Sequence, residues 1–281
     1  MGGGRAGPVR GASAGAMLEA PGPRAEAAWP HPIREEVMTW SIIVHEPATG
    51  WFGIGIATRF FAVGALCPLA AAGIGAVCSQ AMPNPALRQR ALALLGEGIA
   101  APDAVPMVMA TDEGRDHRQL HLVDRAGQSA GFTGSACIDW CGHVAAAGVS
   151  VAGNMLAGPQ VIERTLETWL ANAQLPLVER LLEALDAGEA AGGDKRGRQS
   201  AALLIQGREP YPRLDLRVDD HVAPLEELRR LYAVAREYFI PFSHALPTAA
   251  RPFGRFERAG LEHDIERNAG RPLGPWVTDD G

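Results

Sequence analysis

The sequence has few cysteines, few aromatic residues and no long apolar run. Four cysteines in 281 residues are far fewer than a small disulfide-stapled secreted domain carries. No segment approaches the roughly 20 apolar residues of a membrane-spanning helix, and the first 37 residues lack the apolar stretch of a secretory signal. We therefore expect a soluble cytoplasmic protein without membrane contact.

Metal ligands are also scarce. Cys137 and Cys141 lack the Cys-x-x-Cys or paired-His spacing that would complete a zinc site, so we expect neither a metal nor another cofactor. A zinc enzyme that uses these two cysteines with His143 remains an alternative interpretation.

Positive charge is in deficit. Lys and Arg number 26 against 32 Asp and Glu, which gives a formal net charge of −6. This balance argues against nucleic-acid binding, since the one basic stretch at 195–198 is too short to reverse it. A hydrophobic fraction of 47% is ample for a buried core. A globular protein that binds a small molecule is expected, and a homo-oligomer is compatible with this composition.

Composition divides the chain into three parts. Residues 1–37 are rich in Gly and Pro without a periodic apolar face, and we interpret them as a disordered or mis-assigned extension. Residues 38–240 form the predicted domain. Residues 241–281 are rich in Pro, Arg and Gly and are expected to be an extension with little core of its own.

Runs of predicted strands alternate with predicted helices along the central part. β-branched and aromatic residues between turn signals predict strands at 39–45, 51–58, 74–81, 119–124, 129–133, 144–152, 200–206 and 214–219. Apolar spacing and capping residues predict helices at 84–98, 102–111, 159–172, 176–187 and 225–238. Segregated runs of this kind favour stacked layers over a parallel βαβ sheet. Small residues within the strands would let two sheets approach closely.

The first predicted strand begins with a threonine. If Thr39 became the first residue, through a start at Met38 or through self-cleavage, it would carry both a hydroxyl nucleophile and an α-amine. An α-amine has a pKa of about 7.7–8.0 and can act as a general base near neutral pH. The alternative is that Thr39 is simply a good strand former.

Further polar residues occur near the predicted strand ends. Ser41 shares a strand face with Thr39 and could orient its amine. Arg59 could bind a substrate carboxylate, or it could form a surface ion pair. Gln80 and Asn84 bracket a strand-to-helix turn whose N–H groups could form an oxyanion hole, although Asn84 also suits a helix cap. His117 is the histidine best placed for acid–base catalysis, although charged loop residues are mostly solvated.

A glycine-rich basic loop at 192–199 lies between the predicted helix at 176–187 and the predicted strand at 200–206. Asp194, Lys195, Arg196 and Arg198 could bind an anionic substrate, with the glycines allowing unusual backbone angles. The loop lacks the spacing of a P-loop. A solvated turn is the alternative.

Several stretches together resemble the uncharacterised bacterial family called domain of unknown function 1028, which is placed in the N-terminal-nucleophile (Ntn) hydrolase superfamily. The most specific are A-G-G-D-K-R-G-R-Q-S-A-A-L at 191–203 and D-L-R-V-D-D-H at 215–221. Shorter ones include M-T-W-S at 38–41, A-T-R-F-F-A-V-G at 57–64, G-I-G-A-V-C-S-Q-A at 73–81 and G-N-M-L at 153–156. The resemblance implies an α+β fold with four layers, an αββα sandwich of two antiparallel sheets flanked by helices. It places Thr39 at the nucleophile's position but implies no substrate.

Two functions follow as hypotheses. The first is an Ntn amidohydrolase that cleaves a small, anionic amide or peptide-like compound through a Thr39 acyl-enzyme. Amide hydrolysis enters here by analogy with the superfamily. The second is a catalytically silent module of the same fold that binds an anion or supports assembly.

Overall fold

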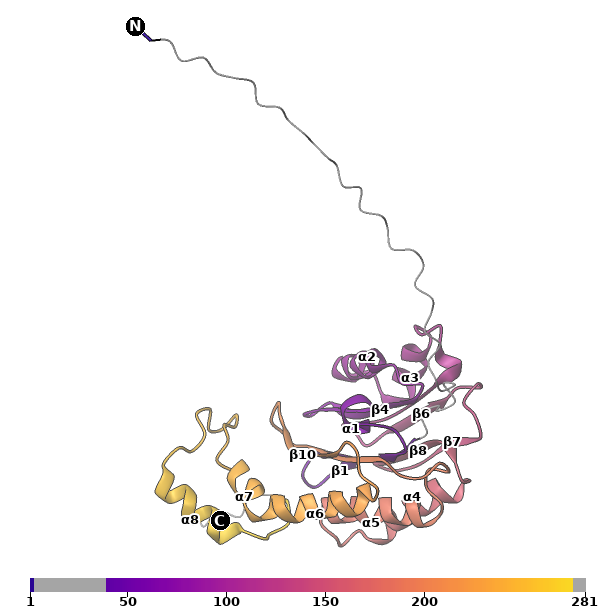
Figure 1. The fold of residues 1–281 in the computed structure, drawn as a ribbon. Coiled ribbons are helices and arrows are strands. Elements are labelled where there is room, and N and C mark those ends of the chain that lie inside the picture. Colours follow the sequence, from indigo (N-terminus) through magenta and orange to yellow (C-terminus); the bar gives the residue numbers. More distant parts are fainter. Residues whose placement is uncertain (3–38, 275–281) are drawn as a thin grey trace. The chain divides into compact units, whose positions relative to one another are not determined.

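The computed structural model describes residues 39–274, together with Met1 and Gly2 (Figure 1). Residues 39–274 belong to one compact unit. Except for Met1 and Gly2, the predicted extension at 1–37 lies outside the described residues. No helix in the described part is long and apolar enough to cross a membrane.

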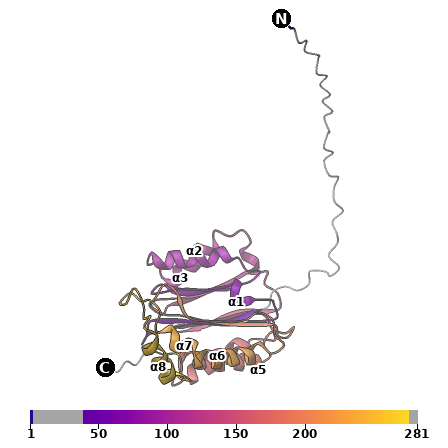
Figure 2. The ribbon, with the colours of Figure 1, turned by 60° about the vertical axis from the view of Figure 1, so that its left-hand side comes forward.

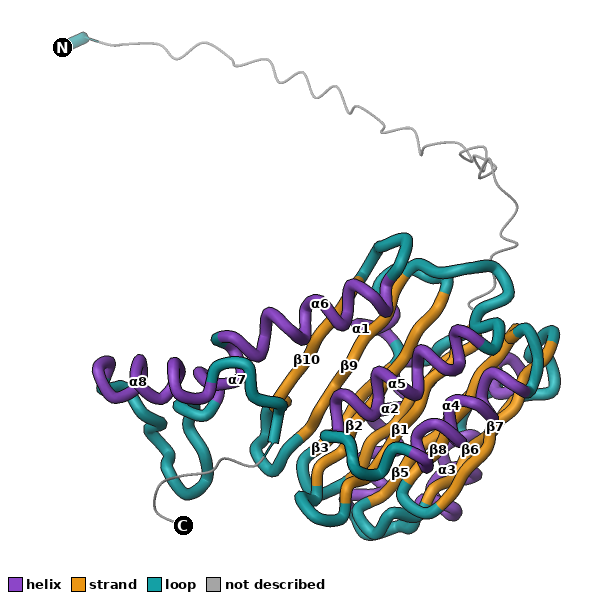
Figure 3. Tube along the Cα trace, turned by 90° about the horizontal axis from the view of Figure 1, so that it is seen from below, coloured by secondary structure: helices purple, strands orange, loops and turns teal. Residues whose placement is uncertain are grey.

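The larger of two sheets contains six antiparallel strands in the order β10–β9–β2–β1–β8–β7. One of its two central strands is β1, which pairs with β2 on one side and with β8 on the other. Figure 3 shows these strands side by side, with the helices that cover them in front. The strands are β1 (Thr39–Glu46), β2 (Trp51–Thr58), β7 (Trp140–Ala146), β8 (Val149–Leu156), β9 (Ser200–Gln206) and β10 (Pro212–Val218).

The smaller sheet contains four antiparallel strands in the order β3–β4–β5–β6. Strands β4 and β5 of this sheet lie against β1 and β8 of the larger one. The strands are β3 (Pro68–Ala71), β4 (Gly75–Ala81), β5 (Arg118–Asp124) and β6 (Ser129–Thr133).

Helices cover the outer face of each sheet (Figure 2). Helices α2 (Pro85–Gly96) and α3 (Ala101–Met109) pack on the smaller sheet. Helices α4 (Gln160–Ala171), α5 (Leu177–Ala190) and α6 (Pro224–Glu237) pack on the larger one. The short segments are α1 (Val63–Leu66), the 3₁₀ turn η1 (Arg115–His117) and α7 (Phe239–Ser243), and α8 (Arg258–Asn268) follows. The structure confirms the predicted mixed α+β fold with two antiparallel sheets.

Three buried apolar clusters lie between the layers, and the alternation of side chains along β1 explains how this strand contributes to two of them. Ile42 and Val44 point toward the helices on the larger sheet, whereas Ile43 points toward the smaller sheet. Successive side chains of a strand face opposite sides, so one central strand contributes to two clusters. On the face of β1 that Ile43 shares, however, the first two residues, Thr39 and Ser41, are buried polar residues.

Two elements differ from the sequence-based predictions. The predicted strand at 144–152 is a hairpin of β7 and β8, which turns at Gly148 with a φ of 72°. Such a backbone angle favours glycine and marks the turn. Strand β3 was not predicted, because its residues Pro68–Ala71 are mostly small.

The C-terminal part also forms secondary structure. Helix α8 lies beyond residue 240, and Leu273 is buried in the cluster between the larger sheet and its helices. The domain boundary at 240 stays a prediction.

Candidate functional site

The first residue of β1 lies buried at an end of the larger sheet. Thr39 pairs with Asn154 of β8, and the register of Trp40 with Ala57 places Thr58 of β2 on its other side. The Thr39 hydroxyl donates to the Thr58 hydroxyl over 3.3 Å. All three polar side chains are buried. The sheet register thus concentrates hydroxyl and amide groups where β1 begins.

Ser41 extends this polar group into the space between the sheets. Its hydroxyl donates to Gln80 Oε1 of β4 over 2.7 Å. The Ser41 hydroxyl oxygen also lies 2.7 Å from His121 Nε2, and His121 Nδ1 lies 3.0 Å from the Ser150 hydroxyl. The structure therefore brings Thr39, Ser41 and Gln80, three predicted site residues, into one buried region.

His121 is held neutral in this region. Burial, with a smaller contribution from nearby His143, lowers the pKa of His121 to about 3. Because the Ser41 proton points to Gln80, the neutral ring is assigned with its proton on Nε2, where it donates to Ser41. Ser150 then donates to Nδ1. The hydrogen bonds consequently run in one direction from Ser150 to Gln80.

Gln119 of β5 continues the network. Its Oε1 accepts from Gln80 Nε2 at 2.8 Å and from Asn154 Nδ2 at 3.0 Å. Its own Nε2 donates to the backbone oxygens of Gly142 and Gly153 and to the Thr133 hydroxyl. This fully satisfied amide links Ser41 to Asn154, and so links the two sheets at the site. Paired buried polar groups of this kind rigidify a structure.

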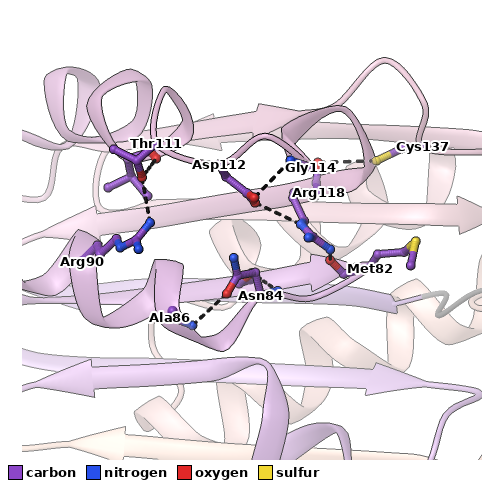
Figure 4. A network of polar contacts seen from close by, with 11 residues as sticks. Met82, Asn84, Ala86, Arg90, Thr111, Asp112, Gly114, Arg118 and Cys137 are labelled. Atoms are coloured by element: carbon purple, nitrogen blue, oxygen red, sulfur yellow. Dashed lines mark hydrogen bonds and ion pairs between the residues drawn. The ribbon is translucent and has the colours of Figure 1, made fainter.

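The backbone N–H groups near Asn84, which were predicted to form an oxyanion hole, have other partners in this structure. The Asn84 side chain caps α2 by accepting from the Ala86 N–H at 3.1 Å, as Figure 4 shows. The Asn84 N–H donates to Ser79, and the Met82 N–H donates to the His117 carbonyl. Each of these backbone donors is already engaged, so none is free for an oxyanion. A catalytic role for Asn84 stays a prediction.

A helix cap gives a measurable prediction at this position. Replacing Asn84 by alanine should lower the free energy of unfolding by about 1 kcal/mol, the usual cost of losing an N-cap acceptor. Serine can restore the acceptor, so the Asn84→Ser variant should keep most of that stability. Urea denaturation of both variants measures the difference. Equal destabilisation by alanine and serine would contradict the capping role.

An ion pair holds the segment before β5 against this turn. Arg118 pairs with Asp112 at 3.0 Å and donates to the Met82 carbonyl (Figure 4). Burial raises the pKa of Asp112, but hydrogen bonds from Arg118 and the Gly114 N–H outweigh it and leave the pKa lowered. His117 is exposed on the adjacent turn, where it lines a cavity of about 20 Å³ together with Asn154. A catalytic role for His117 stays a prediction.

The glycine-rich loop is anchored to the end of β2 by a buried carboxylate. Asp194 accepts from the Arg59 N–H, from the Arg196 N–H and from the Arg196 guanidinium. Arg59 in turn donates through Nη1 to the Arg196 carbonyl at 3.0 Å. The interactions place Arg59, the residue after Thr58, beside the loop. Asp194 therefore has a structural function that the sequence pattern did not reveal.

The other two cations of the loop also have partners. Lys195 pairs with Asp139 at 2.9 Å, and Arg198 pairs with Glu189 at 3.0 Å. Their charges are compensated, which weakens the prediction that they bind an anionic substrate. Within residues 39–274, no group of three or more His, Cys, Asp or Glu side chains is arranged to hold a metal ion. The Cys137, Cys141 and His143 alternative therefore has no geometric support.

Sequence reasoning missed Thr58, Gln119, His121, Ser150 and Asn154. A signal was present, because polar residues at every second position of an otherwise apolar strand mark one buried polar face. Gln119 and His121 show this spacing in β5, and Ser150 and Asn154 share a face of β8. Which strand faces which other strand could not be known without the topology.

These features define a class: a mixed α+β protein with two facing antiparallel sheets and a buried polar site at the start of a central strand. The profile of the family of unknown function DUF1028 matches residues 39–228, so the chain belongs to that family. The chain is similar to a crystal structure of protein SPO2555 from Silicibacter pomeroyi, of the same family. The two are 33% identical with a TM-score of 0.73, over 78% of this chain and 96% of that one. No curated protein matches the chain.

Proposed function

We propose that this chain is an Ntn hydrolase that cleaves the amide bond of a small molecule, with Thr39 as its nucleophile. The observation that carries the proposal is the position of Thr39. It is the first residue of the central strand β1, it is buried beside two polar partners, and the family match begins at this residue. The layered arrangement of helices around two antiparallel sheets supports assignment to the αββα Ntn fold.

The chemistry requires a free α-amine on Thr39. The amine takes the proton of the Thr39 hydroxyl while Oγ1 forms a bond to the substrate carbonyl carbon. The carbon–nitrogen bond then breaks, and the departing amine receives that proton. Water attacks the resulting ester, releases a carboxylic acid and restores the threonine hydroxyl. No external oxidant or reductant is needed for this sequence.

A preference for an anionic substrate is part of the proposal. Arg59 is exposed immediately after Thr58, whose hydroxyl contacts that of Thr39. The Nη1 atom of Arg196 is buried and has no hydrogen-bond partner among the described residues. A guanidinium nitrogen in this state suits a carboxylate ligand. Lys195 and Arg198 contribute less, since both already pair with carboxylates.

A β-lactone tests the nucleophile without knowledge of the substrate, because a reactive hydroxyl opens its ring and becomes acylated. A chain released from a cleavable fusion so that it begins at Thr39 should gain one acyl group on Thr39, located by peptide mass spectrometry. A chain that begins at Met38 is the matched control and should stay unmodified. Equal labelling of both chains, or no labelling of Thr39, would overturn the proposal. The second result would favour the non-catalytic binding module.

A further inference from the structure

Asn154 carries a buried oxygen with no partner. The residue is 1% exposed and lies directly opposite Thr39 in the β1–β8 register. Its Oδ1 atom has no hydrogen-bond partner among the described residues. Buried polar atoms are nearly always paired, because an unmet acceptor keeps its full desolvation cost. The position therefore calls for a donor that the described residues do not supply.

The orientation of the Asn154 amide is fixed by its neighbour. Asn154 Nδ2 donates to Gln119 Oε1 at 3.0 Å. Gln119 cannot turn its amide around, because its Nε2 donates to the carbonyls of Gly142 and Gly153. A flipped Asn154 would then set its oxygen against the Gln119 oxygen. The unpaired atom of Asn154 is consequently an acceptor.

The backbone beside this acceptor is strained. Met155, the next residue, has a φ of 52°, and Ala81 at the end of β4 has a φ of 67°. Left-handed angles are unfavourable for residues with a Cβ and concentrate at functional sites. Both residues line the cavity of about 20 Å³ that Asn154 also lines. The strained residues thus line the same cavity as Asn154.

We propose that Asn154 is a positioning residue whose Oδ1 accepts a hydrogen bond from the free α-amino group of Thr39. The Asn154 amide already reaches the Thr39 backbone, since Nδ2 lies 3.5 Å from the Thr39 carbonyl oxygen. A free amine has more N–H donors than a peptide nitrogen, and it keeps a lone pair for the Thr39 hydroxyl. This inference rests on the proposed function, because it requires a liberated amine.

A water molecule is the competing donor. The cavity beside Asn154, at about 20 Å³, is large enough for one water. In that case Asn154 would bind the water and leave the amine unaffected. The two arrangements differ in how substitutions of Asn154 change the basicity of Thr39.

The test measures the pKa of the Thr39 amine directly. The compact unit that contains Thr39 carries its own cores, so the chain beginning at Thr39 can be prepared with ¹³C-labelled threonine methyl groups. The Thr39 methyl signal reports titration of the neighbouring amine. Asn154→Asp should raise the amine pKa by about one unit or more, since a carboxylate favours the charged form. Asn154→Leu should lower the amine pKa and slow β-lactone acylation about 10- to 100-fold.

Asn172→Asp, at the end of α4, is the matched control and should leave the amine pKa unchanged. An unshifted pKa in Asn154→Asp would overturn the inference and assign the oxygen to water. The aspartate variant has nearly the native shape, so it decides the matter even if the leucine variant does not fold. If the pKa shifts but wild-type Thr39 is not acylated, the positioning stands and the proposed function fails. If wild-type Thr39 is acylated but the amine pKa does not shift in Asn154→Asp, the proposed function stands and the positioning role of Asn154 fails.

Discussion

A chain that begins at alanine in place of Thr39 is expected to lose at least about 1,000-fold in acylation rate, because loss of a covalent nucleophile leaves only binding and electrostatic contributions. The rate is measured by mass spectrometry of the β-lactone adduct over time. The same loss is expected in the hydrolysis of any amide substrate found for the protein. Serine keeps both the hydroxyl and the adjacent amine, so the Thr39→Ser chain should retain measurable acylation.

The control for this prediction is folding. Thr39 is buried and its hydroxyl contacts Thr58, so the alanine chain could lose some stability as well as reactivity. Thr58→Val removes the same contact from the other side and leaves the nucleophile in place. If Thr39→Ala stays folded and still forms the adduct, Thr39 is not the nucleophile.

Lowering the pH below 6.5 is expected to destabilise the protein through His121. Its pKa is about 3 when folded and 6.5 in the unfolded chain. Between these two pH values the unfolded state binds a proton at His121 and the folded state does not. The free energy of unfolding therefore falls as the pH drops from 6.5 toward 3. One such proton changes the free energy of unfolding by about 1.4 kcal/mol per pH unit, or about 2 kcal/mol between pH 6.5 and pH 5. Above pH 6.5 the contribution is fully present.

Urea denaturation between pH 5 and pH 7 measures this dependence. Burial and the nearby Arg213 and Arg251 also lower the pKa of His244 to about 3, and burial lowers the pKa of His45 and of His143, so these four histidines contribute with the same sign. His121→Gln and His244→Gln should each reduce the slope of stability against pH, because these two histidines have folded-state pKa values far below that of the unfolded chain. The slope is compared rather than the absolute stability, because either substitution can destabilise the fold. An unchanged slope in His121→Gln would contradict a neutral buried histidine.

Local patterns predicted most elements of this fold. Strand alternation in β1 and β2, and the Asn84-Pro85 start of α2, are properties of neighbouring residues and were visible in the sequence. The hairpin of β7 and β8 was merged into one strand because small residues obscure the turn at Gly148. Strand β3 was not predicted because it is short and its mostly small residues give only a weak strand signal.

The site was predictable only in part, because its partners come from distant segments. Thr39, Ser41 and Gln80 carry local signals and do lie in one region. Asn154 is adjacent to Thr39 only through the pairing of β1 with β8, which no local pattern specifies. The basic loop was predictable only in part as well. Its charge density was visible, but its partners Asp139 and Glu189 were not.

The central claim is that Thr39 carries a free amine in the working protein. Mass spectrometry of the native protein's N-terminal residue, combined with β-lactone labelling of the same sample, tests it most directly. We predict that labelled molecules begin at Thr39 and carry the acyl group there. Labelled or hydrolytically active molecules that retain a peptide bond before Thr39 would contradict it.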